Sequence, residues 1–161
     1  MKALLKRLFA RADAALAAAH PRDAPALAAL HAASFSRGWS EHEFEQLLTD
    51  RNVLADRAAS GRVTVGFILS RRAADEAEIL SVAVARTWRG RGLARRLLDL
   101  HLRRLAGLGL RTVFLEVDED NAPARRLYAR AGFCEVGRRP GYYAGVNGNS
   151  TAALVLRRDL L

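Results

Sequence analysis

The feature that most constrains this fold is a change of periodicity near the middle of the chain. The stretch AEILSVAVAR, residues 77–86, is rich in apolar and β-branched residues and predicts a buried central strand. From Gly92 onward, leucines recur at helical spacing as far as GLGL, residues 107–110, and predict a helix. The loop between them therefore connects a strand directly to the start of a helix.

This loop has the composition of an anion-binding turn. The first N–H groups of a helix have no partner within the helix, and the helix dipole adds partial positive charge there. Gly90 and Gly92 permit close approach of the backbone. Arginines surround them, namely Arg89, Arg91, Arg95 and Arg96. The spacing fits neither a Walker loop nor a Rossmann fingerprint. By itself the loop is also compatible with a simple tight turn.

The rest of the chain alternates between strand and helix patterns. Ser40 and Glu43 form a capping box at a helix start, with Trp39 placed to pack against Phe44. Helices are expected over residues 22–35, from 40 onward, over 92–107 and over 121–132. Strands are expected over residues 13–20, 52–58, 63–73, 77–86, 111–117, 133–139 and 151–160. The pattern predicts an α/β domain with a mixed sheet.

The charge balance indicates what kind of partner the chain has. There are 26 Lys and Arg against 17 Asp and Glu, a net charge of +9, which favours nucleic acid, a phosphorylated cofactor or a membrane surface. Lys2 and Lys6 are the only lysines, and alanine is abundant. We interpret the excess of arginine as compositional bias and expect no direct binding of nucleic acid.

The number of cysteines and the pattern of apolar residues indicate the cellular compartment. Cys134 is the single cysteine, so an internal disulfide is excluded, and the four histidines are too scattered for a Cys/His zinc site. No apolar run reaches the roughly 18–20 residues of a membrane span, and charged residues interrupt the first twenty positions before they could form an export signal. A cytoplasmic location is expected. Residues 1–12 are expected to be a helical N-terminal extension, packed on the domain or contacting a membrane surface or ribosome, and residues 13–161 a single domain.

Two motifs in order resemble the GCN5-related N-acetyltransferases. In VAVARTWRGRGLARRLL, residues 82–98, the family's acetyl-CoA-binding pattern Arg/Gln-x-x-Gly-x-Gly/Ala is met by Arg89, Gly92 and Ala94. LEVDEDNAPARRLYARAGF, residues 115–133, resembles the strand and helix that follow. The resemblance implies a mixed, mostly antiparallel twisted sheet of about six to seven strands flanked by about four helices, with two strands splayed at the acetyl-CoA site.

Other segments are similar to a subgroup that acetylates the N-terminal alanine of ribosomal protein S18. FSRGWSEHEFEQLL, residues 35–48, carries its Trp-Ser helix start, and GRRPGYYAGVNG, residues 137–148, carries its Arg-x-x-Tyr-Tyr segment. Gly90 stands where glutamine or arginine is common, and Ala94 where glycine is frequent. Neither departure removes a group that the reaction needs. The resemblance implies acetyl-CoA as co-substrate, no metal, and the N-terminal peptide of a protein such as S18 as partner.

Acetyl transfer requires a base and an acid. The amine must lose a proton, attack the thioester carbonyl and expel a thiolate through an oxyanion, and an α-amino group of pKa roughly 7.7–8.0 needs only a modest base. The resemblance makes Glu116 the candidate base and Tyr128 the candidate acid. Without it, Glu116 would be interpreted as a surface carboxylate paired with an arginine, and Tyr128 as a packed aromatic residue.

The resemblance also implies contacts with acetyl-CoA, and an oxyanion held by a backbone N–H near Val84. The expected acetyl-CoA-binding residues are Val82, Ala83, Val84, Gly90, Arg91, Gly92, Leu93, Ala94, Arg95 and Asn121.

The acceptor is less constrained. Residues 118–120, Asp-Glu-Asp, suit a cationic acceptor or simply form a charged loop before the next helix. Four aromatic residues could wall a pocket for the first residue of a peptide: Phe35, Trp39, Tyr142 and Tyr143. Three functions stay open at this point. The preferred one is a protein N-terminal alanine acetyltransferase, the second an acetyltransferase for a small amine such as a polyamine or antibiotic, and the third a basic RNA- or ribosome-binding module.

Overall fold

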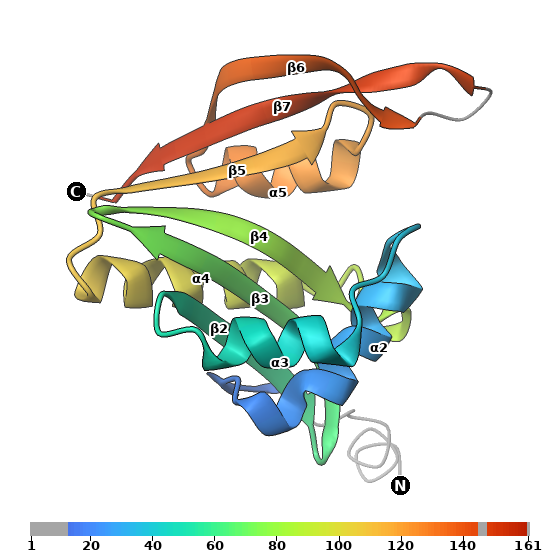
Figure 1. Ribbon diagram of the computed structural model, residues 1–161, viewed down its shortest axis with the longest axis vertical. Coiled ribbons are helices and arrows are strands. Elements are labelled where there is room, and N and C mark those ends of the chain that lie inside the picture. Colours follow the sequence, from blue (N-terminus) through green and yellow to red (C-terminus); the bar gives the residue numbers. More distant parts are fainter. Residues whose placement is uncertain (1–12, 145–147, 161) are drawn as a thin grey trace, which may run out of the picture.

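Seven strands form one mixed sheet in the computed structural model, which describes residues 13–144 and 148–160 (Figure 1). The strands are β1 (Ala15–Ala18), β2 (Val53–Ser60), β3 (Val63–Ala73), β4 (Glu76–Val84), β5 (Thr112–Asp118), β6 (Cys134–Ala144) and β7 (Ser150–Asp159). Their order across the sheet is β1-β2-β3-β4-β5-β7-β6. All neighbours are antiparallel except the central pair, β4 and β5, which is parallel.

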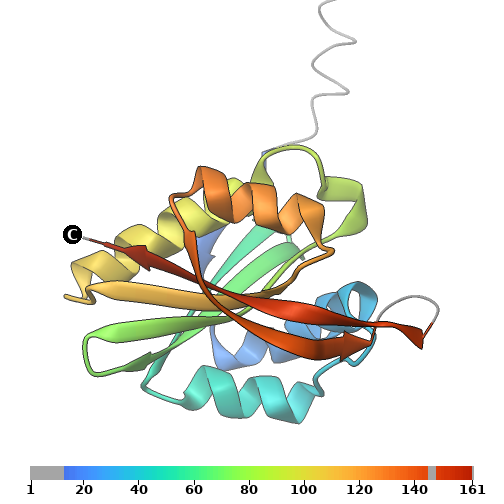
Figure 2. The same cartoon turned by 90° about the horizontal axis from the view of Figure 1, so that it is seen from above.

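Helices cover both faces of this sheet. The described residues contain four α-helices, α2 (Ala24–Ser34), α3 (Glu41–Thr49), α4 (Leu93–Gly107) and α5 (Ala122–Arg130). Figure 2 shows α4 and α5 on one face and α2 and α3 on the other. The predicted mixed sheet of six to seven strands with four helices is confirmed. The predicted extension, residues 1–12, lies outside the described residues. Of the helices described, none is long and apolar enough to cross a membrane.

Local sequence signals place several helix ends. Ser40 Oγ accepts from the N–H of Glu43 at 3.1 Å, and Glu43 returns a bond to the N–H of Ser40 at 2.7 Å, so the predicted capping box is confirmed. Trp39 packs against Phe44 with ring centroids 5.6 Å apart, as predicted. Strand β6 runs to Ala144, beyond the predicted end at residue 139, and passes through Pro140. An edge strand tolerates proline because one of its sides needs no N–H donors.

The buried side chains form two clusters, one under each helical layer. Leu97, Leu98 and Leu105 of α4 meet Val113 of β5 and Leu154 of β7 in the larger cluster. The smaller cluster packs α2 and α3 onto β2, β3 and β4, and contains Leu27, Phe44, Phe67 and Leu69. The larger cluster contains residues from β3 and β4 on one side of the β4–β5 junction and from β5 and β7 on the other. It therefore holds the two halves of the sheet together on the face covered by α4.

The central strands separate after a short pairing. Residues Glu76–Ile79 pair with Thr112–Leu115, but β4 continues to Val84 and β5 to Asp118. The register between β3 and β4 passes from Ser70↔Ile79 to Leu69↔Ser81, so Leu80 is an extra residue in β4. Such a bulge bends its strand and increases the local twist. The bulge falls where the pairing with β5 stops, and the predicted splay of two strands is visible in Figure 1.

Candidate active site

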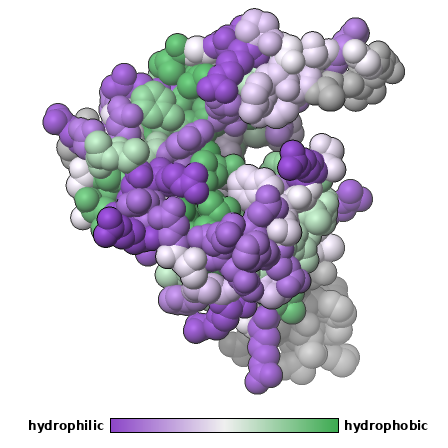
Figure 3. Space-filling model, in the orientation of Figure 1, coloured by the Kyte–Doolittle hydropathy of each residue, from purple (hydrophilic) through white to green (hydrophobic). Residues whose placement is uncertain are grey.

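A cavity of about 670 Å³ lies where β4 and β5 diverge. Its walls come from α2, β4, β5, α5 and β6, so segments far apart in the sequence meet there. Figure 3 shows this face of the molecule hollowed between the two halves, with apolar surface beside the hollow. Beyond Ile79 and Leu115 the facing backbone edges of β4 and β5 no longer pair with each other, which leaves their polar groups open to a ligand.

Glu116 lies at the edge of this gap. Its neighbour Leu115 is the last residue of β5 paired with β4, and the Glu116 side chain is 20% exposed and lines the cavity. The carboxylate is paired with Arg139 of β6, with Oε1 2.9 Å from Nη2. Both properties considered from the sequence, a cleft position and an arginine partner, therefore occur together. The ion pair does not remove Glu116 from the cavity.

Tyr128 reaches the same cavity from α5. The side chain is 8% exposed, and its ring lies edge-on to Phe133 at 5.7 Å between centroids. Burial, with a smaller contribution from the nearby Tyr143, raises the pKa of Tyr128 to about 12. The phenol is therefore a weaker acid than an ordinary tyrosine of pKa about 10. It holds its proton throughout the physiological range and can donate a hydrogen bond at any working pH.

The glycine loop has the backbone geometry of an anion cradle. Gly90 and Gly92 have φ of 73° and 77°, in the left-handed region that favours glycine, and Gly92 is the N-cap of α4. The first bond of the helix runs from the N–H of Arg96 to the carbonyl of Gly92 at 3.1 Å. The N–H groups of Leu93, Ala94 and Arg95 are consequently unpaired within the helix. Within the described part of the chain, no side chain caps this end.

The arginines of the loop do different things. Arg89 donates from Nε to the carbonyl of Val84 at 3.0 Å and from Nη2 to Ser34 Oγ at 3.3 Å, and so ties the loop to β4 and α2. Arg91 lies over the ring of Trp88, 5.2 Å from its centroid. Two others already have acidic partners, because Arg95 pairs with Asp99 at 2.9 Å and Arg96 with Asp13 at 2.7 Å. Part of the predicted positive charge is thus balanced locally.

Strand β4 presents alternate backbone groups to the gap. The N–H of Ala85 donates to Val65 of β3 at 2.8 Å. Because N–H groups alternate between the two edges of a strand, those of Val84 and Val82 point toward the side of β5. The same alternation directs the N–H of Ala83 toward its partner on β3, Phe67, and the side chains of Ala83 and Leu93 are buried. The geometry suits the predicted contacts of Val82 and Val84, whose roles stay predictions, and leaves Ala83 without a polar group that faces the gap.

Asn121 combines two tasks at the start of α5. Its Oδ1 accepts from the N–H of Ala124 at 3.2 Å and so caps the helix. The side chain also lines the cavity. Since capping uses the oxygen, the amide NH₂ group is left to donate to a bound molecule.

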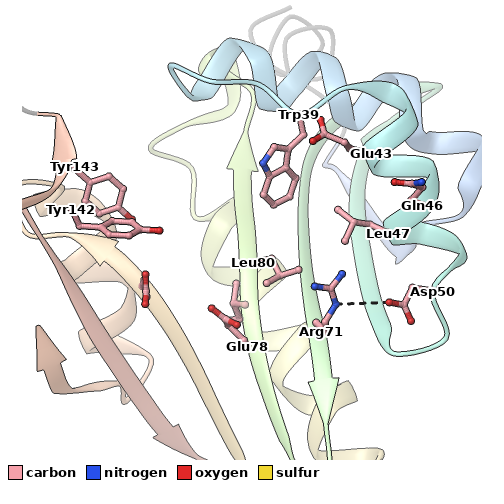
Figure 4. A pocket seen from close by; sticks show the side chains of 12 residues that line it. Trp39, Glu43, Gln46, Leu47, Asp50, Arg71, Glu78, Leu80, Tyr142 and Tyr143 are labelled. Atoms are coloured by element: carbon pink, nitrogen blue, oxygen red, sulfur yellow. Dashed lines mark ion pairs between the residues drawn. The ribbon is translucent and has the colours of Figure 1, made fainter. Parts of the chain in front are cut away.

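Aromatic side chains line one part of the cavity. The four predicted residues, Phe35, Trp39, Tyr142 and Tyr143, all line the cavity. A second cavity of about 590 Å³ shares several of its walls and extends toward α3. In Figure 4, Tyr142 and Tyr143 lie across this pocket from Trp39 and Leu80.

The three consecutive acidic residues that begin at the end of β5, residues 118–120, make different contacts. Asp118 lines the cavity, and its Oδ1 accepts from the N–H of Asp120 at 3.0 Å. Glu119 is engaged elsewhere, with Arg138 at 2.7 Å and with the N–H of Ala152 at 2.9 Å. Those bonds, together with Arg138, lower the pKa of Glu119. Glu119 and Asp120 therefore fit the interpretation as a charged loop, and Asp118 alone adds acidity to the cavity.

Two cavity residues carried no signal in the sequence. His31 of α2 is buried and stacks on Trp39 with 4.4 Å between ring centroids. Its Nδ1 accepts a hydrogen bond from the backbone N–H of Trp39 at 3.1 Å. Burial lowers the pKa of His31, so the ring is neutral at physiological pH. Ser81 is 7% exposed, and its hydroxyl has no hydrogen-bond partner among the described residues.

Comparisons with known proteins agree with this geometry. Residues 24–133 match the model of the Acetyltransferase (GNAT) family. The chain is 36% identical over 92 residues to the [ribosomal protein bS18]-alanine N-acetyltransferase of Haemophilus influenzae, a match that covers 57% of this chain and 62% of that protein. It is 29% identical over 133 residues to the Escherichia coli K12 protein of the same name, covering 83% of this chain and 89% of the relative.

Solved structures show the same arrangement. The crystal structure of the ribosomal-protein-S18-alanine N-acetyltransferase from Escherichia coli superposes with a TM-score of 0.85 at 26% identity, over 91% of this chain and 94% of that one. Arabidopsis thaliana NAA60 in complex with acetyl-CoA shares the fold, with a TM-score of 0.78 at 22% identity, over 91% and 98% of the two chains. With its splayed strands, its glycine loop and a family match over most of its length, the chain belongs to the acetyltransferase (GNAT) family.

Proposed function

We propose that this protein transfers an acetyl group from acetyl-CoA to the N-terminal α-amino group of a protein, with the N-terminal alanine of ribosomal protein S18 as its acceptor. The observation that carries the proposal is the place of Glu116. It lines the cavity between the diverging strands, and aromatic residues from the segment after α2 and from β6 line the same cavity. The relatives named for S18 alanine acetylation support the choice of acceptor.

The loop and strand around α4 fit the phosphate-bearing part of acetyl-CoA. A Cβ added at Gly90 or Gly92 would meet none of the described atoms within 4 Å, so the space beside the loop is free for a ligand. The unpaired N–H groups of Leu93, Ala94 and Arg95 would bind the diphosphate, helped by the dipole of α4. Val82, Val84 and Asn121 would bind the remainder through backbone and amide groups. Acetyl-CoA supplies the activated acyl carbon.

The side chains then divide the chemistry. Glu116 accepts the proton that the acceptor amine loses as its nitrogen bonds to the carbonyl carbon. The N–H of Val84 stabilises the oxyanion. As the C–S bond breaks, Tyr128 donates a hydrogen bond to the departing thiolate. A thiol has a pKa of roughly 8.5 and Tyr128 one of about 12, so hydrogen-bond donation is favoured over complete proton transfer.

A kinetic comparison of Glu116→Gln with Glu119→Gln tests the proposal. Both changes replace a carboxylate near the end of β5, but Glu119 is held by Arg138 and by the backbone N–H of Ala152 and lines none of the cavities that Glu116 lines. We expect Glu116→Gln to lower kcat on peptides that begin with alanine by about 100-fold or more, as for the loss of a general base. Glu119→Gln should stay near the wild-type rate, and both variants should bind acetyl-CoA normally.

The acceptor class is tested in the same assay with polyamines and aminoglycosides beside the peptides. Mass spectrometry identifies the acetylated nitrogen. A higher kcat/KM for a small amine than for every alanine peptide would contradict the proposed acceptor while leaving the chemistry intact. Equal rates for Glu116→Gln and wild type would contradict the base.

A further inference from the structure

The ion pair between Arg139 and Glu116 is the starting point. Arg139 Nη2 lies 2.9 Å from Glu116 Oε1, with the arginine side chain 60% exposed and the carboxylate 20%. Among the described residues, this is the one ion pair made by Glu116. The contact engages Oε1, so Oε2 is left for a second partner. Because Arg139 contacts only one oxygen of the Glu116 carboxylate, it places a positive charge beside the carboxylate without blocking access to the other oxygen.

An irregularity in the backbone of β6 determines where Arg139 lies. Arg139 pairs with Ala153 of β7, but Tyr143 pairs with Thr151, so β6 carries extra residues between them. This irregular stretch contains Gly141 at φ +66°, where a Cβ would lie 3.2 Å from Ser150 Oγ. The irregularity brings Arg139 and both tyrosines to one wall of the site, because Tyr142 and Tyr143 line the cavities and the Arg139 guanidinium lies 5.8 Å from the Tyr142 ring centroid.

The neighbouring arginine makes different contacts. Arg138 pairs with Glu119 at 2.7 Å and approaches Glu135 at 3.9 Å. Successive side chains of a strand point to opposite faces, which explains why adjacent arginines have different partners. The chain therefore provides a control for Arg139 one residue away, with the same charge and strand.

The other charged and titratable groups around Glu116 are mostly acidic or neutral. The cavities that Glu116 lines also receive groups from α2, α3, β3, β4, β5, α5 and β6, namely His31, Arg37, Glu43, Asp50, Arg71, Glu76, Glu78, Asp118, Tyr128, Tyr142 and Tyr143. Arg71 already has an acidic partner, Asp50, at 3.8 Å. Without Arg139, Glu116 would face the carboxylates of Glu78 and Asp118 with no cation paired to it.

We propose that Arg139 is a positioning residue for acetyl transfer: it holds Oε1 of Glu116 in place, so that Oε2 is free to receive the proton of the acceptor amine. This inference rests on the proposed role of Glu116 as base. Arg139 acts through Glu116 and bonds to neither substrate.

The kinetic test compares Arg139→Ala, Arg139→Lys and Arg138→Ala on an alanine peptide at one pH, with saturating acetyl-CoA. For Arg139→Ala we expect kcat to fall about tenfold or more, because a misplaced catalytic group is costly, while the KM for the peptide stays near the wild-type value, because Arg139 acts through Glu116. Arg139→Lys should restore part of kcat, since it keeps a cation beside Glu116 but lacks the planar fork. Arg138→Ala should match wild type in both.

A second measurement separates this inference from the proposed function. The effect of Arg139→Ala on kcat is measured again in the Glu116→Gln background, with whichever amine the enzyme acetylates. Little further loss supports the inference, because Arg139 then acts only through Glu116. A full further loss overturns the inference while leaving Glu116 as the base, and a Glu116→Gln rate equal to wild type overturns the base and the inference together. A lower acceptor KM with unchanged kcat in Arg139→Ala also overturns it, because the arginine would then compete with the substrate.

Discussion

Two side chains at the end of the cleft differ in burial, and their chemistry follows from that difference. Tyr128 is enclosed by α5 and the sheet, which raises its pKa to about 12, whereas Glu116 is partly open and has a cation beside it. A buried phenol keeps its proton. Tyr128 can therefore donate a hydrogen bond before any substrate binds, and Glu116 has one carboxylate oxygen that Arg139 does not engage.

This difference predicts a simple pH profile for Tyr128. Because its pKa lies near 12, the phenol stays protonated across the working range, so the wild-type rate should rise as the acceptor amine deprotonates near pH 8 and then stay flat to pH 10. Tyr128→Phe should lower the plateau about 10- to 100-fold without moving its edges. Single-turnover rates from pH 6 to 10 check this, with acetyl-CoA affinity as the control. A wild-type decline below pH 10 that the variant lacks would contradict the raised pKa.

At this scale the sequence indicates some groups and cannot indicate others. Glu116 and Tyr128 stand in a motif with fixed spacing, so a family resemblance is enough to nominate them. The partnership of Glu116 with Arg139 joins residues on two strands that are not adjacent in the sheet, and His31 meets Trp39 across a turn. Such contacts depend on the path of the chain through space, which no local pattern encodes.

Among the elements, the loop before α4 gives the sharpest test of a backbone requirement. Gly92 has φ +77° and Gly61, in the β2–β3 turn, has φ +60°, and an added Cβ would meet no described atom within 4 Å at either position. Alanine at each should therefore cost a similar 1–2 kcal/mol of folding stability, since both force a side chain into the left-handed region.

The two substitutions should differ in acetyl-CoA binding. Gly92→Ala places a methyl group where we propose the diphosphate binds, so its Kd for acetyl-CoA should rise at least tenfold, about 1.4 kcal/mol. Gly61 lies in the β2–β3 turn and not at the start of α4, so Gly61→Ala should keep the wild-type Kd. Thermal unfolding with and without acetyl-CoA measures both effects. Equal ligand-induced stabilisation of the two variants would show that the loop does not hold the diphosphate.

Element boundaries show what periodicity can and cannot supply. The capping box before α3 and the leucines of α4 act locally, and these helices were predicted from them. The bulge at Leu80 gave no such signal, because it is defined by pairing with β3, and that pairing joins segments about ten residues apart. The extension of β6 past Pro140 likewise depends on β7 beside it.

In the whole molecule, the cleft replaces backbone hydrogen bonds between β4 and β5, and contacts elsewhere in the core must offset their loss. Only four residues of β4 pair with β5, so the two halves of the sheet share few backbone bonds. A buried polar group ties α4 to the first half: His101 Nε2 lies 2.5 Å from Ser70 Oγ, and its Nδ1 lies 2.7 Å from Asp56, which also bonds Arg104. These contacts connect α4 with β2 and β3, and β3 pairs with β4, which borders the cleft.

This group should make the stability of the protein depend on pH in the acid range. Burial lowers the pKa of His101 to about 3, against roughly 6.5 in an unfolded chain. The unfolded state therefore takes up a proton first, and the contribution of His101 is complete above pH 6.5 and falls by up to about 1.4 kcal/mol per unit toward pH 3. Between pH 6.5 and 5 the loss should be about 2 kcal/mol.

Urea unfolding at several pH values tests this contribution with His101→Gln. Glutamine cannot titrate, so the variant should be less stable than wild type at pH 7 but should lose stability less steeply between pH 6.5 and 4. His42→Gln, at an exposed position on α3, should keep the wild-type slope. If His101→Gln and wild type showed equal slopes, the imidazole would not be the group that resists protonation in the folded state, and the acid sensitivity of the molecule would have to lie in its carboxylates. A shallower slope in His101→Gln alone would place that sensitivity at the contact between α4 and the sheet.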